Sequence, residues 1–333
     1  MAKKTMYCEN EKAKCKTEEF EKMQITPYTL KYGGESAEES EARVNQALKA
    51  KRKQKAVAKN SDGAAVEVEV GAAGAITGTK EWAVETVNFI TGCSHDCRYC
   101  YGRHMAVDRF KRVTPEEWSQ PCVREAEVCK KRHRVDGTVM TPSTHDICPE
   151  FINETIVVLD KLIDAGNDIL LVSKPHIECI EKICARYTEN REQIRFRFTI
   201  GCNNNELLAY WEPGAPSHEE RLACLKYAYE HGFSTSVSVE PMLDGEHIVE
   251  HVERLLPWIS DSVWIGKMNC IRSRVRIENE VDESMVEAIE AGQTDERIMQ
   301  IYDALKNIPK IRWKESVKKV VGLKLADKPG LDI

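Results

Sequence analysis

Short apolar runs alternate with longer helical patterns from about residue 84 onward. This alternation is typical of repeated βα units, whose parallel strands are buried and rich in Val, Ile and Phe. Six runs fit such strands, at residues 86–90, 138–140, 169–173, 194–200, 235–239 and 263–265. We therefore expect an α/β fold, a partial (β/α)6 TIM-type barrel, whose chemistry would lie at the carboxyl ends of the strands.

Signals for helix boundaries lie between these runs. Thr114 precedes a proline and two glutamates, which is a capping box with proline in the first helical turn, and Ser217 begins a second capping pattern. Gly166 and Gly232 lie where helices should end. Two further helical stretches, 295–307 and 313–321, should close the fold.

The first 75 residues differ from the rest, because Lys and Glu alternate there without an apolar period and a Gly-Ala-Ala-Gly stretch follows at 71–74. We predict a flexible, partly helical extension over 1–75, a core over 76–280 and a C-terminal helical segment over 281–333. A helical stretch at 38–59 ends in a basic run, which is either a solvated surface or a phosphate contact. The run consists of Lys49, Lys51, Arg52, Lys53, Lys55 and Lys59.

Charge and hydropathy limit the class of protein. The formal net charge of -6 argues against binding of nucleic acid through overall charge, but it allows a local basic groove. No apolar run reaches the ~18 residues of a membrane span, and the first residues lack an apolar secretory signal. We expect a globular, cytoplasmic protein that no membrane holds. The 13 cysteines are an odd number, which favours free thiols and a metal site over a complete set of disulfides.

Three of these cysteines follow the first predicted strand, with the spacing C-x3-C-x2-C: Cys93, Cys97 and Cys100. Thiolates this close in sequence can converge on one metal centre. Three thiolates leave one iron of a four-iron cubane without a protein ligand, and the amino and carboxylate groups of S-adenosylmethionine suit that iron. The alternative is a structural zinc ion with His95 or His104 as its fourth ligand.

The triplet, with an aromatic residue directly before its last cysteine, resembles the radical S-adenosylmethionine (SAM) superfamily. Residues 87–242 resemble its spore photoproduct lyase-like branch in an ordered set of short matches. These are Asn88-Phe89, Gly92-Cys93 through Cys100-Tyr101, Ser143-Thr144-His145-Asp146, Lys174, Arg195-Phe196-Arg197-Phe198-Thr199, Glu212-Pro213-Gly214, Arg221-Leu222 and Pro241. The resemblance implies a barrel of the radical SAM kind and two cofactors, a [4Fe-4S] cluster and SAM.

The resemblance also implies roles for single residues. The three cysteines would hold the cluster, Tyr99 would lie near the adenine, and Lys174 would pair with the carboxylate of SAM. Each role has a plainer alternative, such as packing for an aromatic side chain or capping for a loop hydroxyl. The further expected contacts are Ser143 and Thr144 to the methionine part, Thr199 to the ribose, and Glu240 to the ribose or the substrate.

The sequence departs from the lyases at one position. Those enzymes place a cysteine hydrogen donor after the second strand, where this chain has Ser143. A serine O–H bond is too strong to give up a hydrogen atom readily, so Cys148 is the candidate donor, although it is equally well a buried thiol. Repair of thymine dimers is therefore not the favoured function.

Two basic clusters suggest a phosphate-bearing substrate. The resulting hypothesis is an enzyme that reductively cleaves SAM and abstracts hydrogen from a nucleic acid or nucleotide, with flavodoxin or ferredoxin as reductant. The alternatives are radical modification of a peptide or small metabolite, and a non-catalytic, zinc-stabilised module that binds nucleic acid. The clusters are Arg98, Arg103, Arg109, Lys111 and Arg112, and Lys130, Lys131, Arg132, His133 and Arg134.

Overall fold

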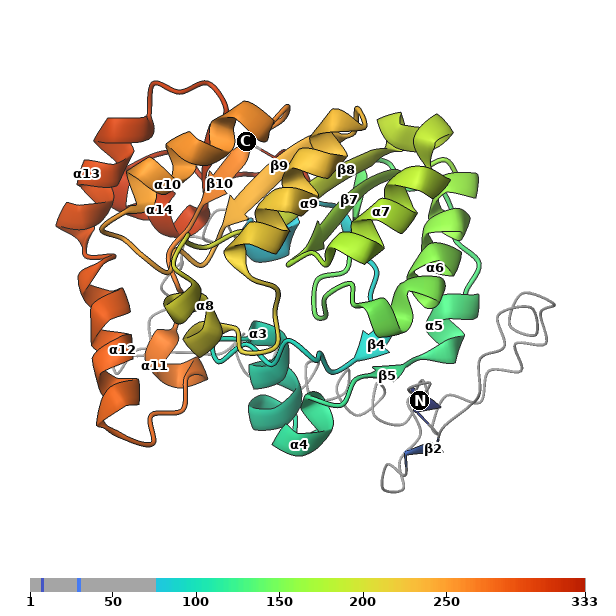
Figure 1. Cartoon of the computed structure of the whole chain (residues 1–333), viewed down its shortest axis with the longest axis horizontal. Coiled ribbons are helices and arrows are strands. Elements are labelled where there is room, and N and C mark those ends of the chain that lie inside the picture. The colour runs from blue at the N-terminus through green and yellow to red at the C-terminus, as the bar shows by residue number, and fades with distance from the viewer. Residues whose placement is uncertain (1–6, 9–28, 31–75, 333) are drawn as a thin grey trace, which may run out of the picture.

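The computed structural model describes residues 7–8, 29–30 and 76–332 (Figure 1). Its main feature is a parallel sheet of seven strands in the order β11-β10-β9-β8-β7-β6-β3. Because neighbouring strands in this sheet follow chain order from β6 to β11, each crossover returns to the next position, as in a (β/α) barrel. The strands are β3 (Glu85–Thr86), β6 (Thr138–Thr141), β7 (Asp168–Ser173), β8 (Ile194–Thr199), β9 (Ser234–Val239), β10 (Val263–Ile265) and β11 (Ile311–Trp313).

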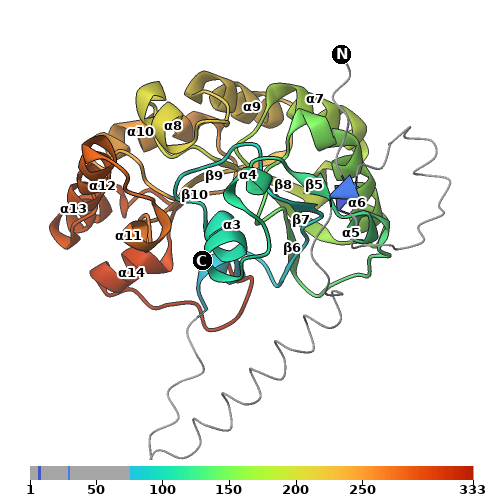
Figure 2. The ribbon, with the colours of Figure 1, turned by 90° about the horizontal axis from the view of Figure 1, so that it is seen from below.

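Helices cover the outside of this sheet, and Figure 2 shows α6, α7, α9, α10 and α13 in an arc around the strands. In Figure 1, α3 and α4 lie below the strands. The helices are α3 (Tyr101–Arg103), α4 (Pro115–Trp118), α5 (Glu125–Cys129), α6 (Ile152–Asp164), α7 (Ile177–Arg186), α8 (Asn205–Trp211), α9 (His218–Glu230), α10 (Ile248–Leu255), α11 (Ile271–Arg274), α12 (Glu280–Ala291), α13 (Asp295–Leu305) and α14 (Glu315–Val321). A π-helical turn, His104–Arg109, continues α3, and short 3-10 turns lie at Gly78–Glu81, Pro149–Phe151, Thr188–Gln193 and Leu256–Trp258.

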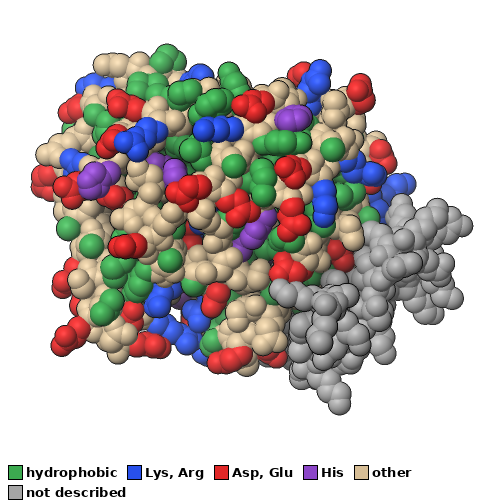
Figure 3. Space-filling model, viewed as in Figure 1, with side chains coloured by type: hydrophobic (Ala, Val, Ile, Leu, Met, Phe, Trp, Pro, Cys, Tyr) green, Lys and Arg blue, Asp and Glu red, His purple; other side chains and the backbone are tan. Residues whose placement is uncertain are grey.

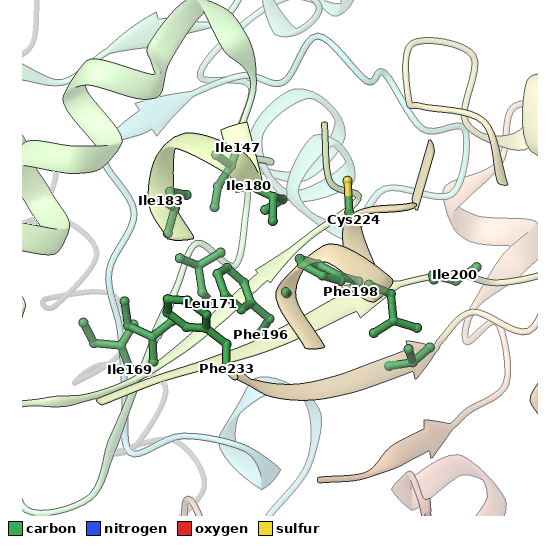
Figure 4. Packing of buried hydrophobic residues seen from close by; sticks show 14 of the residues in the cluster. Ile147, Ile169, Leu171, Ile180, Ile183, Phe196, Phe198, Ile200, Cys224 and Phe233 are labelled. Carbon is green, nitrogen blue, oxygen red and sulfur yellow. The ribbon is translucent and has the colours of Figure 1, made fainter. Parts of the chain in front are cut away.

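The two faces of strand β8 explain how the barrel is packed. Phe196 and Phe198 are fully buried and belong to the core beneath the outer helices, where Phe196 contacts the ring of Phe233 (Figure 4). The alternating residue Arg197 is also fully buried and pairs with Asp332 over 3.0 Å. Since side chains alternate across a strand, the phenylalanines occupy the outer face and the arginine the inner face. The inner face therefore carries a buried ion pair that ties the C-terminal residues to the sheet.

A second sheet combines four strands of two residues each from the N-terminal part of the chain, in the order β2-β1-β5-β4. In this sheet, strands β4 and β5 pair antiparallel. The predictions for residues 1–75, including the basic run, otherwise lie outside the described residues. The strands are β1 (Tyr7–Cys8), β2 (Thr29–Leu30), β4 (Ile90–Thr91) and β5 (Cys122–Val123).

Most of the expected elements are confirmed, with two corrections. The first predicted strand, 86–90, is split between β3 and β4, which belong to different sheets. Residue Trp313, expected to begin a helix, ends strand β11, and α14 begins at Glu315. The strand β11 lies beyond residue 280, so the sheet extends past the predicted core, and the three-part division stays a prediction.

The predicted helix ends are confirmed as well. Thr114 and Glu117 form the capping box, and the Ser217 side chain caps α9. Gly166 and Gly232 adopt left-handed backbone angles just after α6 and α9. No helix in the described part of the chain is long and apolar enough to cross a bilayer, and the cytoplasmic location stays a prediction.

Acid should destabilise the fold through His251. Its buried Nε2 donates to the carbonyl of Ile200 over 3.0 Å, and burial lowers the pKa of His251 from 6.5 to about 4. Because the unfolded chain binds this proton near pH 6.5 and the folded chain only near pH 4, the free energy of unfolding should fall as the pH drops between those values. The slope should reach up to ~1.4 kcal/mol per pH unit for one histidine.

Urea unfolding at several pH values between 4 and 7 measures this slope. Burial lowers the pKa of His145 to about 4 as well. Burial also lowers the pKa of His176 and of His218. The variant His251→Gln, which keeps a side-chain N–H, should therefore lose part of the slope and keep the rest. An unchanged slope in that variant would contradict the assignment to His251.

Candidate active site

A cavity of about 900 Å³ lies at the carboxyl ends of the strands. Its wall contains every residue that the sequence assigned to the cluster or to SAM. The cysteine loop contributes Cys93, Cys97, Tyr99 and Cys100, and the segments that end or follow β6, β7, β8 and β9 contribute Ser143, Thr144, Lys174, Thr199 and Glu240. The structure thus brings together side chains that lie up to 147 residues apart in sequence, from Cys93 to Glu240.

Two glycines allow the cysteine loop to pack closely against its neighbours. Gly92 has a φ of +87°, and a Cβ there would lie 2.5 Å from the carbonyl oxygen of Trp118. A Cβ on Gly214 would lie 2.1 Å from the carbonyl oxygen of Ser94. Since carbonyl oxygens of the backbone cannot move aside cheaply, both positions require glycine. The loop is therefore held between the C-terminal end of α4 and the segment after α8.

The three cysteines offer free thiols inside this loop. Burial raises the pKa of Cys93, Cys97 and Cys100, and the ammonium of Lys174 opposes this shift in part for Cys97. Buried thiolates need compensating positive charge, and one nearby ammonium does not balance three of them. The donor set therefore fits a multiply charged metal centre bound by thiolates.

Both histidines of the zinc alternative contact groups outside the triplet. The Nδ1 of His95 lies 3.0 Å from Asp146, and the Nδ1 of His104 lies 3.3 Å from Asp108. Ligand atoms of Cys93, His95 and Asp146 do lie within 4.8 Å of one another. That group contains one cysteine of the triplet and leaves two others, so it does not fit one four-ligand zinc site built on all three thiols.

Asp146 organises the wall of the cavity, although the sequence assigned it no role. Its Oδ1 accepts from the backbone N–H of Lys174 at 2.6 Å and from the hydroxyl of Ser173 at 2.9 Å. Its Oδ2 lies 3.4 Å from the ammonium of Lys174. Burial opposes ionisation, but the charges of Lys174 and His95 hold the pKa of Asp146 well below its usual range. Asp146 therefore fixes Lys174 as a cation. The sequence signal for Asp146 was its position in the matched stretch 143–146.

Asn88 is a second residue without an assigned role. Its Oδ1 accepts from the backbone N–H groups of Ser143 at 2.8 Å and Thr144 at 2.9 Å, and its Nδ2 donates to the Ser143 hydroxyl at 2.9 Å. The asparagine thus sets the conformation of the loop after β6. The sequence signal for Asn88 was the matched pair Asn88-Phe89 near the end of the first predicted strand.

Tyr99 is tied to a buried ion pair. Its hydroxyl donates to Glu212, whose other oxygen lies 2.6 Å from Arg221, and both charged side chains are 0% exposed. Arg221 also donates to the carbonyl oxygens of Pro216 and Thr199. Because the hydroxyl is engaged inside the protein, only the ring and backbone of Tyr99 can face a ligand in the cavity.

The far end of the cavity carries another charge network. The ammonium of buried Lys314 lies 2.7 Å from Glu81 and 3.6 Å from Glu240. Burial raises the pKa of Glu240, and Lys314 opposes that shift. Glu240 therefore has a partner within the protein as well as access to the cavity.

Two expectations are not matched by the geometry. Cys148 is buried and does not line the cavity; its Sγ contacts the hydroxyl of Ser94 at 3.4 Å and the Nε2 of His95 at 3.6 Å. None of the ten residues of the two basic clusters lines the cavity either. Several pair with carboxylates elsewhere, such as Arg98 with Asp282 and Arg132 with Glu127.

Comparisons with known proteins agree with this fold and site. A family model described as the Radical SAM superfamily matches residues 87–258, more than half of the chain. A curated relative, the uncharacterized protein ORF301 of Acidianus two-tailed virus, is 27% identical over 189 residues, which cover 54% of this chain and 61% of that protein. This chain therefore spans less than two thirds of that relative's length.

Solved structures extend the comparison to the whole fold. A spore photoproduct lyase variant has a TM-score of 0.50 at 14% identity, with 93% of this chain and 97% of that chain covered. A spore photoproduct lyase in complex with dinucleoside spore photoproduct has a TM-score of 0.48 at 14% identity, with 89% and 92% covered. The first of these likenesses shows a common fold. Because the family model matches more than half of the chain, the alternative of a non-catalytic zinc module is not supported, and the chain belongs to the radical SAM superfamily, whose enzymes use a [4Fe-4S] cluster and SAM.

Proposed function

We propose that this chain binds a [4Fe-4S] cluster through Cys93, Cys97 and Cys100 and acts on a nucleotide or nucleic-acid substrate. When bound, the cluster would supply the electron that cleaves SAM to methionine and a 5'-deoxyadenosyl radical, which would remove a hydrogen atom from the substrate. One observation supports this proposal: the three free thiols line the same cavity as all six residues proposed to bind SAM. A cavity of about 900 Å³ is near the upper end of the usual range for small-molecule sites, ~300–1,000 Å³.

The residues around the cavity would bind and orient SAM. Ser143 and Thr144, held by Asn88, offer small hydroxyls to the methionine part, and Lys174 offers an ammonium to its carboxylate. The ring of Tyr99 would lie against the adenine. Thr199 and Glu240 offer oxygens to the ribose hydroxyls. Because Asp146 fixes Lys174, the ammonium is already positioned before a ligand arrives.

The substrate class rests on the outer wall of the cavity. Lys80, Arg274 and Lys319 line it, and so does the ring of Tyr101, which is 53% exposed. The guanidinium of Arg274 lies 5.3 Å from the centre of that ring. Cations next to an exposed aromatic ring are the usual means of binding a phosphate and stacking a base. Figure 3 shows Lys and Arg side chains in a hollow between the regions of α11 and α3.

An external reductant completes the proposed reaction, since the cluster must receive an electron for each cleavage of SAM. Flavodoxin or ferredoxin is the proposed donor. The chain itself would position the substrate and exclude water from the reacting atoms.

The test is anaerobic reconstitution with iron and sulfide, followed by reduction and product analysis with SAM. Formation of 5'-deoxyadenosine should rise when a nucleotide or oligonucleotide substrate is added. The variant Arg274→Ala should weaken binding of that substrate at least ~10-fold and reduce its salt dependence. Arg109→Ala removes the same type of side chain at an exposed position away from the cavity, and it should leave binding unchanged.

Different outcomes would separate the two parts of the proposal. Cleavage of SAM that responds to peptides or neutral metabolites and not to nucleotides would overturn the substrate class. Equal binding by the Arg274→Ala and Arg109→Ala variants would do the same. A reconstituted chain without any cubane cluster would overturn the cofactor assignment.

A further inference from the structure

Three metal-binding side chains meet behind the cysteine loop, outside the cavity already described. The Nε2 atoms of His95 and His176 lie 2.9 Å apart, and the Sγ of Cys148 lies 3.6 Å from the Nε2 of His95. The ligand atoms of all three residues lie within 4.8 Å of one another. His95 and Cys148 are buried and His176 is half-buried. None of the three lines the cavity.

The separations are those of ligands around one small metal ion. A tetrahedral zinc ion with Zn–N distances of ~2.0–2.1 Å and a Zn–S distance of ~2.3 Å places its ligand atoms roughly 3.3–3.7 Å apart. The separation of 3.6 Å between Cys148 and His95 agrees with this value, and the two histidines are slightly closer. Two imidazoles and one thiolate form a donor set that suits Zn²⁺.

The second nitrogen of each histidine points toward a carboxylate. The Nδ1 of His95 lies 3.0 Å from Asp146, and the Nδ1 of His176 lies 3.7 Å from Glu220. A histidine bound to a metal through one nitrogen commonly directs the other to a carboxylate, which orients the ring and makes it a stronger ligand. His95 has this arrangement at hydrogen-bond distance, and His176 has a longer contact of the same kind.

We propose that His95, Cys148 and His176 bind a zinc ion next to the cluster loop. Zinc binds through the two Nε2 atoms and the Cys148 thiolate, whose proton leaves to solvent, and a water molecule occupies the fourth position. The three ligands come from the cysteine loop, the loop after β6 and the segment before α7. The ion therefore links the loop that carries Cys93 and Cys97 to two strands of the sheet. This site does not depend on the proposed reaction.

Zinc binding by the full-length chain tests the proposal. The variant with Cys93→Ala, Cys97→Ala and Cys100→Ala removes the cluster thiols, so any tight site that remains lies elsewhere. Under oxygen-free conditions, competition with a chromophoric chelator should show one tightly bound Zn²⁺ per chain. Adding His176→Ala should weaken this binding at least ~100-fold, because losing even a partner of a metal ligand typically costs ~10–100-fold in affinity. Adding His251→Ala, which removes another buried histidine, should not.

Cobalt provides a second measurement. Co²⁺ in this background should show a thiolate-to-metal absorption band that disappears with Cys148→Ser and persists with Cys184→Ser, a matched buried thiol. If the triple variant does not fold, the cluster-loaded wild-type chain should still contain one zinc ion per chain in elemental analysis. The proposal is overturned if the folded triple variant binds no zinc, if His176→Ala binds zinc as tightly as its parent, or if the cluster-loaded chain contains none.

Discussion

Replacing Cys97 by alanine should abolish both cluster binding and SAM cleavage. Cys97 is the middle thiol of the triplet and 5% exposed, and it lies in the wall of the cavity between the β4 end of the loop and α3. With two thiolates left, a cubane would have two irons without protein ligands, and both would be open to solvent. After anaerobic reconstitution and reduction, the variant should give no electron paramagnetic resonance signal of a reduced cubane and no 5'-deoxyadenosine above background.

The control for this result is Cys184→Ala, which removes an equally buried free thiol in α7, far from the cavity wall. It should keep the iron content and the cleavage rate of the parent chain. Retention of full cleavage by Cys97→Ala would refute the assignment of the triplet. Loss of cleavage in both variants would instead show that general damage to the fold is responsible.

The strands could be predicted because buried parallel strands need continuous apolar runs. Runs such as the one that becomes β7 leave little alternative. Strand β11 was missed, since Ile311, Arg312 and Trp313 are too few to show a period and a helical pattern follows directly. The first strand was wrong in its extent because Asn88 turns its side chain to Ser143 and Thr144, and the chain leaves one sheet for the other around that contact.

The positions of the site residues could be predicted, but their partners could not. A residue that ends a parallel strand must reach the same edge of the sheet as its neighbours, which places Lys174 and Thr199 together. Nothing local indicates that Asp146 would hold Lys174, or that His95 would meet His176, 81 positions away. Such pairs arise from packing of distant segments, and a single sequence contains no signal for them.

For the two basic clusters, the sequence suggested a place at the cavity that they do not have. A run such as Lys130 to Arg134 is easily seen in the sequence, but the sequence does not show on which face of the fold these charges lie. Helix α5 ends directly before this run and leads it away from the cavity. Among the cations that do line the cavity, Lys80, Arg274 and Lys319 come from three separate segments of the sequence.

The largest loss of stability should follow from breaking the buried pair of Arg221 and Glu212. Both side chains are 0% exposed and 2.6 Å apart. Arg221→Met keeps an unbranched apolar stem but leaves the Glu212 carboxylate buried with only the Tyr99 hydroxyl as a partner. Removing one member of a buried ion pair typically costs ~3–5 kcal/mol. Urea unfolding should show a decrease of that size in the free energy of unfolding.

An exposed ion pair supplies the matched control. Arg254 and Glu250 form a surface pair with side chains 65% and 57% exposed, so Arg254→Met should cost no more than ~1 kcal/mol. Similar losses for Arg221→Met and Arg254→Met would show that burial adds nothing to the pair.

A third variant separates the charge from the packing. Adding Glu212→Gln to Arg221→Met removes the uncompensated charge while keeping an acceptor for Tyr99, so part of the lost stability should return. Since Glu212 anchors the ring of Tyr99 between Cys97 and Cys100, Arg221→Met should also lower the iron retained after reconstitution, and the added Glu212→Gln should restore it in part. Recovery of stability without recovery of iron would mean that the carboxylate, and not the hydrogen bond to Tyr99 alone, holds the cysteine loop in place.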